Sequence, residues 1–127
     1  MPVLYRIDPD LNRILTECRG ETTLREVIGH FDELEVDPGC PEGADVLLDL
    51  SSMTTLPNVG QMRSAAERAA QASSKVRFGS IAIVAAGEEI FGMARVFETF
   101  TERLFARSAV VRSREAAERW LDGPGSH

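Results

Sequence analysis

Asp49 and Ser51 carry the side-chain types best suited to chemistry, because they follow an apolar run in the stretch VLLDLSSMTTLPNVGQM (46–62). In open α/β folds, ligands and switches usually lie at the carboxyl ends of strands. A carboxylate and a hydroxyl at such a position can bind a ligand, take part in a switch or contact a partner. We interpret Asp49 as a strand-end residue that accepts hydrogen bonds from loop backbone amides, as aspartate commonly does.

The other reactive residue types do not form a recognisable catalytic or metal site. A hydrolase triad needs a histidine base, but His30 lies in an amphipathic helix pattern and His127 is the last residue. The histidines and cysteines lack the close spacing of zinc ligands, and no glycine-rich phosphate motif follows a strand. We therefore expect no enzyme, no catalytic residue, no metal and no cofactor. For a test of enzymatic activity, Asp49 and Ser51 are the residues to substitute first.

The composition narrows the class of protein and its partners. The 127 residues suffice for one domain, and the net charge of −6 with a single lysine, Lys75, leaves no basic block for nucleic acid. Apolar runs are far shorter than the ~20 residues of a membrane span, so none is expected. Cys18 in a strand pattern and Cys40 in a loop are typical of a reduced protein, which predicts a cytoplasmic location.

The first half of the chain predicts a hairpin, a helix and a strand. Runs at 3–7 and 11–19 flank the turn Asp8-Pro9-Asp10, which indicates an antiparallel pair. Thr23 and Glu26 have the spacing of a capping box before an amphipathic pattern, so a helix begins there and ends before Asp37. After a loop, residues 45–50 are apolar enough for a strand covered on both faces.

The second half predicts three helices alternating with two strands. A stripe of small residues between Val59 and Ser73 favours a helix lying close on a sheet; strand 78–86, helix 88–105 and strand 108–112 follow, and Ser113 caps a last helix. The order ββαβαβαβα predicts a single α/β domain over residues 1–122, with a flexible tail at 123–127. We expect right-handed crossovers, a mainly parallel sheet with an antiparallel edge hairpin, and helices packed over it.

The helix predicted at 88–105 has an unusually wide apolar face. At 3.6 residues per turn its apolar side chains sweep from about −120° to +100° around Ile90. Covering one sheet needs a stripe of only ~100° or somewhat more. A neighbouring helix, a second copy of the chain or an apolar ligand must bury the surplus, and we predict a homodimer. Its candidate interface, which is also the candidate ligand face, comprises Phe91, Met93, Arg95, Phe97 and Phe100.

The run LDLSSMTTLPNVG at 48–60 resembles the pattern LDLSxVxxIDSSG of the STAS domain, named for sulfate transporters and anti-sigma-factor antagonists. In this resemblance Leu56 corresponds to a hydrophobic residue that plugs the loop into the core. Asn58 stands where STAS domains have a phosphorylatable serine, and asparagine cannot take a phosphate. The resemblance therefore implies a STAS-like fold whose loop lacks the phospho-acceptor. The other matching positions are Asp49, Leu50, Ser51, Met53 and Gly60.

A second resemblance covers nearly the whole chain. The segment GMARVFE at 92–98, the pair Arg107-Ser108 and the ending with Trp120-Leu121 are similar to a group of small bacterial STAS-like proteins. That group shares the fold of the sporulation anti-sigma-factor antagonists and has also been likened to CRAL-TRIO lipid carriers. Such a resemblance implies fold more strongly than function.

Two functions are consistent with these patterns. We favour a non-catalytic cytosolic interaction or regulatory module, with Arg68 adding to its docking face. The alternative is a carrier or sensor of a lipid or small apolar ligand bound along the Phe-rich helix, with Arg95 as anchor for an acidic head group. The residues predicted to bind a protein partner are Asp49, Ser51, Ser52, Asn58, Gly60 and Arg63.

Overall fold

Strands and helices alternate along the chain in the computed structural model, which describes residues 3–40, 42–73 and 78–123. The observed order confirms the predicted single α/β domain with ββαβαβαβα connectivity. The strands are β1 (Val3–Asp8), β2 (Arg13–Gly20), β3 (Ala44–Met53), β4 (Phe78–Val84) and β5 (Ser108–Val111). The helices are α1 (Leu24–Val36), α2 (Val59–Ser73), α3 (Glu88–Thr101) and α4 (Arg114–Asp122).

The five strands lie in one sheet in sequence order, β1-β2-β3-β4-β5. β1 pairs with β2 in antiparallel fashion, and the other three pairs are parallel. In the turn before β2, Asp8 Oδ1 accepts hydrogen bonds from the backbone amides of Asp10 and Leu11. The antiparallel edge hairpin and the mainly parallel sheet are thereby confirmed.

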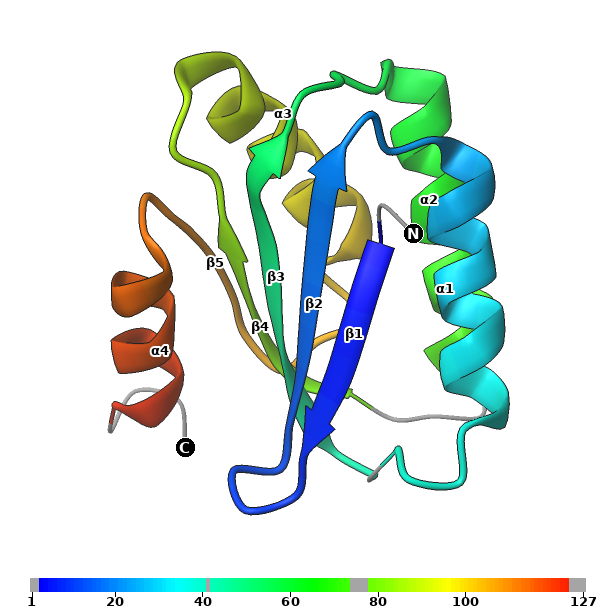
Figure 1. Cartoon of the computed structure of the whole chain (residues 1–127), viewed down its shortest axis with the longest axis vertical. Coiled ribbons are helices and arrows are strands. Elements are labelled where there is room, and N and C mark those ends of the chain that lie inside the picture. Colours follow the sequence, from blue (N-terminus) through cyan, green and yellow to red (C-terminus); the bar gives the residue numbers. More distant parts are fainter. Residues whose placement is uncertain (1–2, 41, 74–77, 124–127) are drawn as a thin grey trace.

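Helices cover the two faces of the sheet unequally. α1, α2 and α3 lie on one face and α4 on the other (Figure 1). On the first face Ile83 packs with Ala94 of α3, and on the second Ala82 packs with Leu121 of α4. α4 packs mainly on β3, β4 and β5, so β1 at the sheet edge is covered by α1 on one face.

Local sequence signals fix the starts of α1 and α4. The predicted capping box of α1 is present: Thr23 Oγ1 accepts from the Glu26 amide at 3.3 Å, and Glu26 Oε1 accepts from the Thr23 amide at 2.9 Å. Ser113 caps α4 by accepting from the Ala116 amide. Such caps satisfy amides that have no partner within the helix.

Two predictions about the helices are wrong. The buried alanines of α2 do not lie directly on the sheet, because α2 packs mainly against α1 and α3. Arg68 of α2 joins α2 to α1 by ion pairs to Asp32 at 2.6 Å and Glu35 at 2.9 Å. α2 thus packs on α1, which itself lies against the sheet through Leu34 (Figure 1).

The second correction concerns the end of α3. The helix stops at Thr101 rather than at residue 105, because the following residues turn toward the start of β5 and the Ala106 amide donates to the Gly79 carbonyl at 3.0 Å. Phe105 leaves the helix and stacks on Phe78, with ring centroids 5.7 Å apart. Beyond Gly123, the predicted tail lies outside the described residues. Among those described, no helix has the length and apolar character needed to cross a membrane.

Candidate functional site

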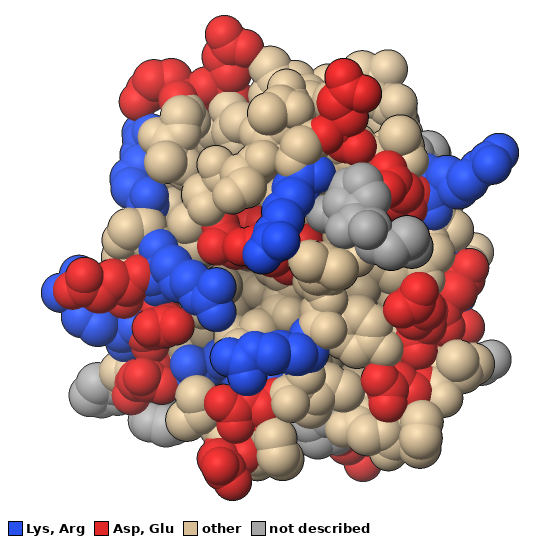
Figure 2. Space-filling model, in the orientation of Figure 1, with Lys and Arg blue, Asp and Glu red and all other residues tan. Residues whose placement is uncertain are grey.

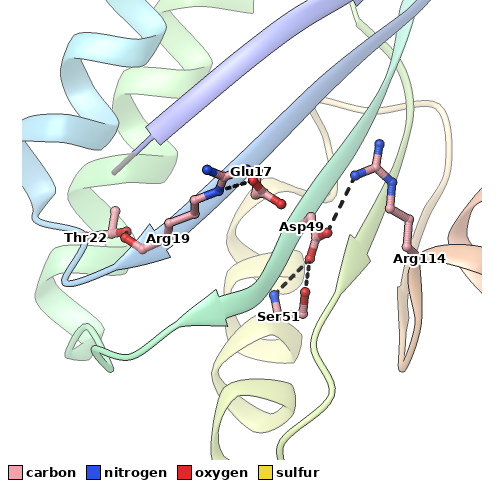
Figure 3. Close-up of polar contacts among 6 residues, drawn as sticks. All are labelled: Glu17, Arg19, Thr22, Asp49, Ser51 and Arg114. Atoms are coloured by element: carbon pink, nitrogen blue, oxygen red, sulfur yellow. Dashed lines mark hydrogen bonds and ion pairs between the residues drawn. The ribbon is translucent and has the colours of Figure 1, made fainter. Parts of the chain in front are cut away.

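Asp49 lies inside β3 (Ala44–Met53), on the face of the sheet that carries α4. Its Oδ1 accepts hydrogen bonds from the Ser51 backbone amide at 2.9 Å and from Ser51 Oγ at 2.6 Å. Its Oδ2 lies 3.9 Å from Arg114 NH1 of α4, as Figure 3 shows. Asp49 is buried, and its oxygens are occupied by these contacts. β3 continues past Asp49 to Met53 and Ser51 is itself part of the strand, so the expectation of a strand-end residue bonded to loop amides is wrong, and the contacts of Asp49 are made inside the strand.

Charged side chains of β2 lie next to Asp49 on the same sheet. Glu17 of β2 stands beside Asp49 in the parallel register and forms an ion pair with Arg19 (Figure 3). A shallow groove of about 260 Å³, lined in part by Arg6, Glu17, Arg19 and Arg114, lies here. Figure 2 shows acidic and basic side chains interleaved around a hollow on this side. Three arginines and one glutamate stand in this lining, and two of the arginines, Arg19 and Arg114, are paired with the carboxylates of Glu17 and Asp49.

The loop between β3 and α2 ends at Asn58, which forms two hydrogen bonds with Gln61. Asn58 Oδ1 accepts from the Gln61 amide at 2.8 Å, and Gln61 Oε1 accepts from the Asn58 amide at 2.9 Å. This reciprocal pair has the form of a capping box. The residue that replaces the phospho-acceptor serine of the resemblance therefore caps α2. Its signal in the sequence is the spacing Asn-x-x-Gln, which the sequence reading missed.

We predict that Asn58→Ala lowers the free energy of unfolding by about 1 kcal/mol, because the cap is lost. Asn58→Ser should change it by less than half as much, since serine caps helices about as well as asparagine. Urea denaturation of both variants measures the difference. Equal losses in the two variants would contradict a capping role for this side chain.

The other predicted docking residues are dispersed. Ser52 and Gly60 are exposed, and the guanidinium of Arg63 lies over the Phe100 ring at 5.3 Å. Arg68 is held by the two carboxylates of α1 described above and faces α1.

The five residues predicted on the wide apolar face of α3 separate into three environments. Phe91 lies under the guanidinium of Arg112 at 3.7 Å, as Phe100 lies under Arg63. Arg95 is 64% exposed and pairs with Glu98 at 3.2 Å, outside any cavity wall described below. Met93 and Phe97 line a cavity. Arginine guanidinium groups thus cover part of the surplus, and the homodimer stays a prediction.

A cavity of about 380 Å³ lies between the sheet and the layer formed by α1, α2 and α3. It lies where α2 packs mainly on α1 and α3 rather than on the strands, whereas α1 contacts the sheet through Leu34 beside Ile14 and Ala44. Ligand pockets in proteins span roughly 300–1,000 Å³ and are mostly apolar with a few polar groups. Its apolar wall includes Val27, Phe31, Leu34, Val46, Leu48, Leu50, Met53, Met62, Ala65, Ala69, Phe78, Ile81, Met93, Phe97 and Phe105.

The mouth of the cavity is marked by its exposed lining residues. These are Thr23, Leu56 and Gln61, and all three lie just beyond the carboxyl ends of β2 and β3. There the loops are joined, because the Thr22 amide donates to Thr55 Oγ1 and Thr55 Oγ1 donates to the Thr22 carbonyl. Leu56 is 48% exposed, so it borders the opening and does not plug the loop into the core as the resemblance implied.

Three polar side chains lie deeper in the cavity wall: Thr16 and Cys18 of β2 and His30 of α1. His30 Nε2 lies 3.4 Å from Thr16 Oγ1, while His30 Nδ1 is buried without a hydrogen-bond partner. Burial lowers the pKa of His30 to about 4 and raises the pKa of Cys18 to about 12, so both are neutral near pH 7. The sequence reading assigned His30 only to a helix pattern, and its partner is fixed by the tertiary fold.

Comparison with known proteins adds no assignment: no protein-family model matches the chain, and no curated protein matches its sequence. Within residues 3–40, 42–73 and 78–123, no three histidine, cysteine or acidic side chains are grouped so that they could hold a metal ion.

Proposed function

We propose that this protein binds a small, mainly apolar molecule in the cavity between its sheet and helices, as a carrier or sensor of that molecule. The observation that carries the proposal is the cavity of about 380 Å³, with an almost wholly apolar wall and an opening at the loops after β2 and β3. Burial of an apolar ligand there would remove apolar surface of the ligand and of the wall from water, which is favourable.

The mouth also suits exchange of a ligand. Leu56 is half exposed at its border, and Met53 and Met62 lie within the wall. Methionine has an unbranched, flexible side chain that adapts to ligands of different shape. Opening requires the hydrogen bonds between Thr22 and Thr55 to part, which is a local change at two loops.

Binding of the neutral fluorescent probe N-phenyl-1-naphthylamine tests the proposal. Protein freed of bound molecules on a hydrophobic resin should bind one probe per chain, with saturable enhancement of fluorescence. Native mass spectrometry of freshly purified protein should show whether a natural ligand is retained and whether the chain is a dimer.

A matched pair of variants locates the probe. Ala69→Leu extends a side chain into the cavity and should weaken probe binding at least about tenfold, because the site loses volume and contacts. Ala117→Leu makes the same change on α4, across the sheet, and should leave probe affinity within about twofold in the folded protein. Equal effects of the two variants, or no saturable binding by the wild type, would overturn the proposal.

A protein-interaction module is the second candidate, because two apolar side chains are exposed around the loop after β3: Leu56 is 48% and Val59 52% exposed. Val59 is not part of the cavity wall. A Val59→Ser variant that loses a defined protein partner but keeps probe binding would support this candidate.

A further inference from the structure

The cavity wall contains no charged side chain among the residues that line it. Its lining residues are apolar except for threonines, Cys18, His30 and Gln61. Arg95, the anchor that the sequence suggested for an acidic head group, points to solvent and is paired with Glu98. A carboxylate or phosphate drawn into this space would lose its hydration without gaining a cation, which is costly. The wall therefore selects against an anionic group inside the cavity.

Thr16 and His30 form a polar pair inside this apolar wall. Thr16 is 3% exposed and its Oγ1 lies 3.4 Å from His30 Nε2. His30 is neutral near pH 7, so Nε2 either donates a hydrogen bond to Oγ1 or accepts one from it. In the first case the Thr16 hydroxyl proton remains free, and in the second the oxygen lone pairs remain free. A group that can both donate and accept satisfies Thr16 in either case.

We infer that the ligand of the cavity is an uncharged apolar molecule bearing a hydroxyl group, and that this hydroxyl binds at Thr16 beside His30. The inference rests on the proposed function, since it assigns a chemical class to the ligand of the same cavity. A buried polar group that meets a matching ligand group contributes specificity, because a ligand without that group leaves it unsatisfied. The apolar remainder of the ligand extends along Met93 and Phe97 of α3.

Competition against N-phenyl-1-naphthylamine at pH 7 tests the inference with three chain-matched compounds: 1-octanol, octanoate and 1-chlorooctane. We expect 1-octanol to bind at least about 100-fold more tightly than octanoate, because only octanoate must bury a charge. We expect Thr16→Val to weaken the binding of 1-octanol about five- to tenfold, which is the effect of one hydrogen bond. The same substitution should change the affinity for 1-chlorooctane by less than about twofold. Thr99→Val, on the exposed side of α3, serves as the matched control and should change neither compound.

The outcomes separate this inference from the proposed function. If the probe binds but octanoate competes as well as 1-octanol, the cavity binds ligands and the inferred charge class is wrong. If Thr16→Val weakens the binding of 1-octanol and 1-chlorooctane equally, the ligand hydroxyl does not bind at Thr16. If neither the probe nor any competitor binds to the wild type, the proposed function itself fails.

Discussion

The same substitution, alanine to leucine, is expected to stabilise the protein at Ala69 and to destabilise it at Ala117. Both side chains are buried, but Ala69 borders the cavity whereas Ala117 lies in the packed layer between α4 and the sheet. At Ala69 the three added carbons extend into the cavity against its apolar wall and should raise the free energy of unfolding by about 2 kcal/mol, at about 0.8 kcal/mol per carbon. At Ala117 overpacking should lower it by about 1–3 kcal/mol.

Urea denaturation of ligand-free protein measures both changes, and the two variants should differ by about 4 kcal/mol. The comparison is controlled for helix propensity, because leucine and alanine are both strong helix formers. A lower free energy of unfolding for Ala69→Leu than for the wild type would mean that the space between sheet and helices is closed in solution. Similar free energies of unfolding for Ala69→Leu and Ala117→Leu would lead to the same conclusion.

The sequence predicted the order of elements because each has a local signal. The capping box at Thr23 and Glu26, the cap at Ser113 and the turn after Asp8 act within a few residues, and the structure contains all three. The strands 78–86 and 108–112 were visible as apolar runs, and the structure shortens both at their ends. Boundaries depend on tertiary contacts, as the early end of α3 at Thr101 illustrates.

The cavity could not be predicted from the sequence, because it depends on how far one layer stands from another. The stripe of alanines on α2 indicates a close neighbour but not which one, and that neighbour is α1 together with α3. Of the residues on the wide apolar face of α3, Met93 and Phe97 line the cavity. Thr16 and His30 are fourteen positions apart, on β2 and α1, and their side chains meet only in the folded protein.

Acidification from pH 6.5 to 4 is expected to remove about 3 kcal/mol of stability through His30 alone, since burial lowers its pKa from an ordinary 6.5 to about 4. The folded state holds His30 neutral, whereas the unfolded chain binds a proton below pH 6.5. Protonation therefore favours the unfolded state throughout this interval. The stability is fully present above pH 6.5 and is lost as the pH falls toward 4.

Replacement of His30 by phenylalanine should flatten this part of the pH profile, because the ring contacts with Tyr5 and Phe31 can persist while the titrating group is gone. His127→Gln, which alters the other histidine of the chain, should retain the wild-type profile. Asp37 does not confuse the result: hydrogen bonds from Tyr5 and Gly39 hold its pKa below the ordinary 3.8, so its contribution is lost only at lower pH. Parallel profiles for wild type and His30→Phe between pH 6.5 and 4 would show that His30 is accessible to water, and would remove it from the wall of a dry cavity.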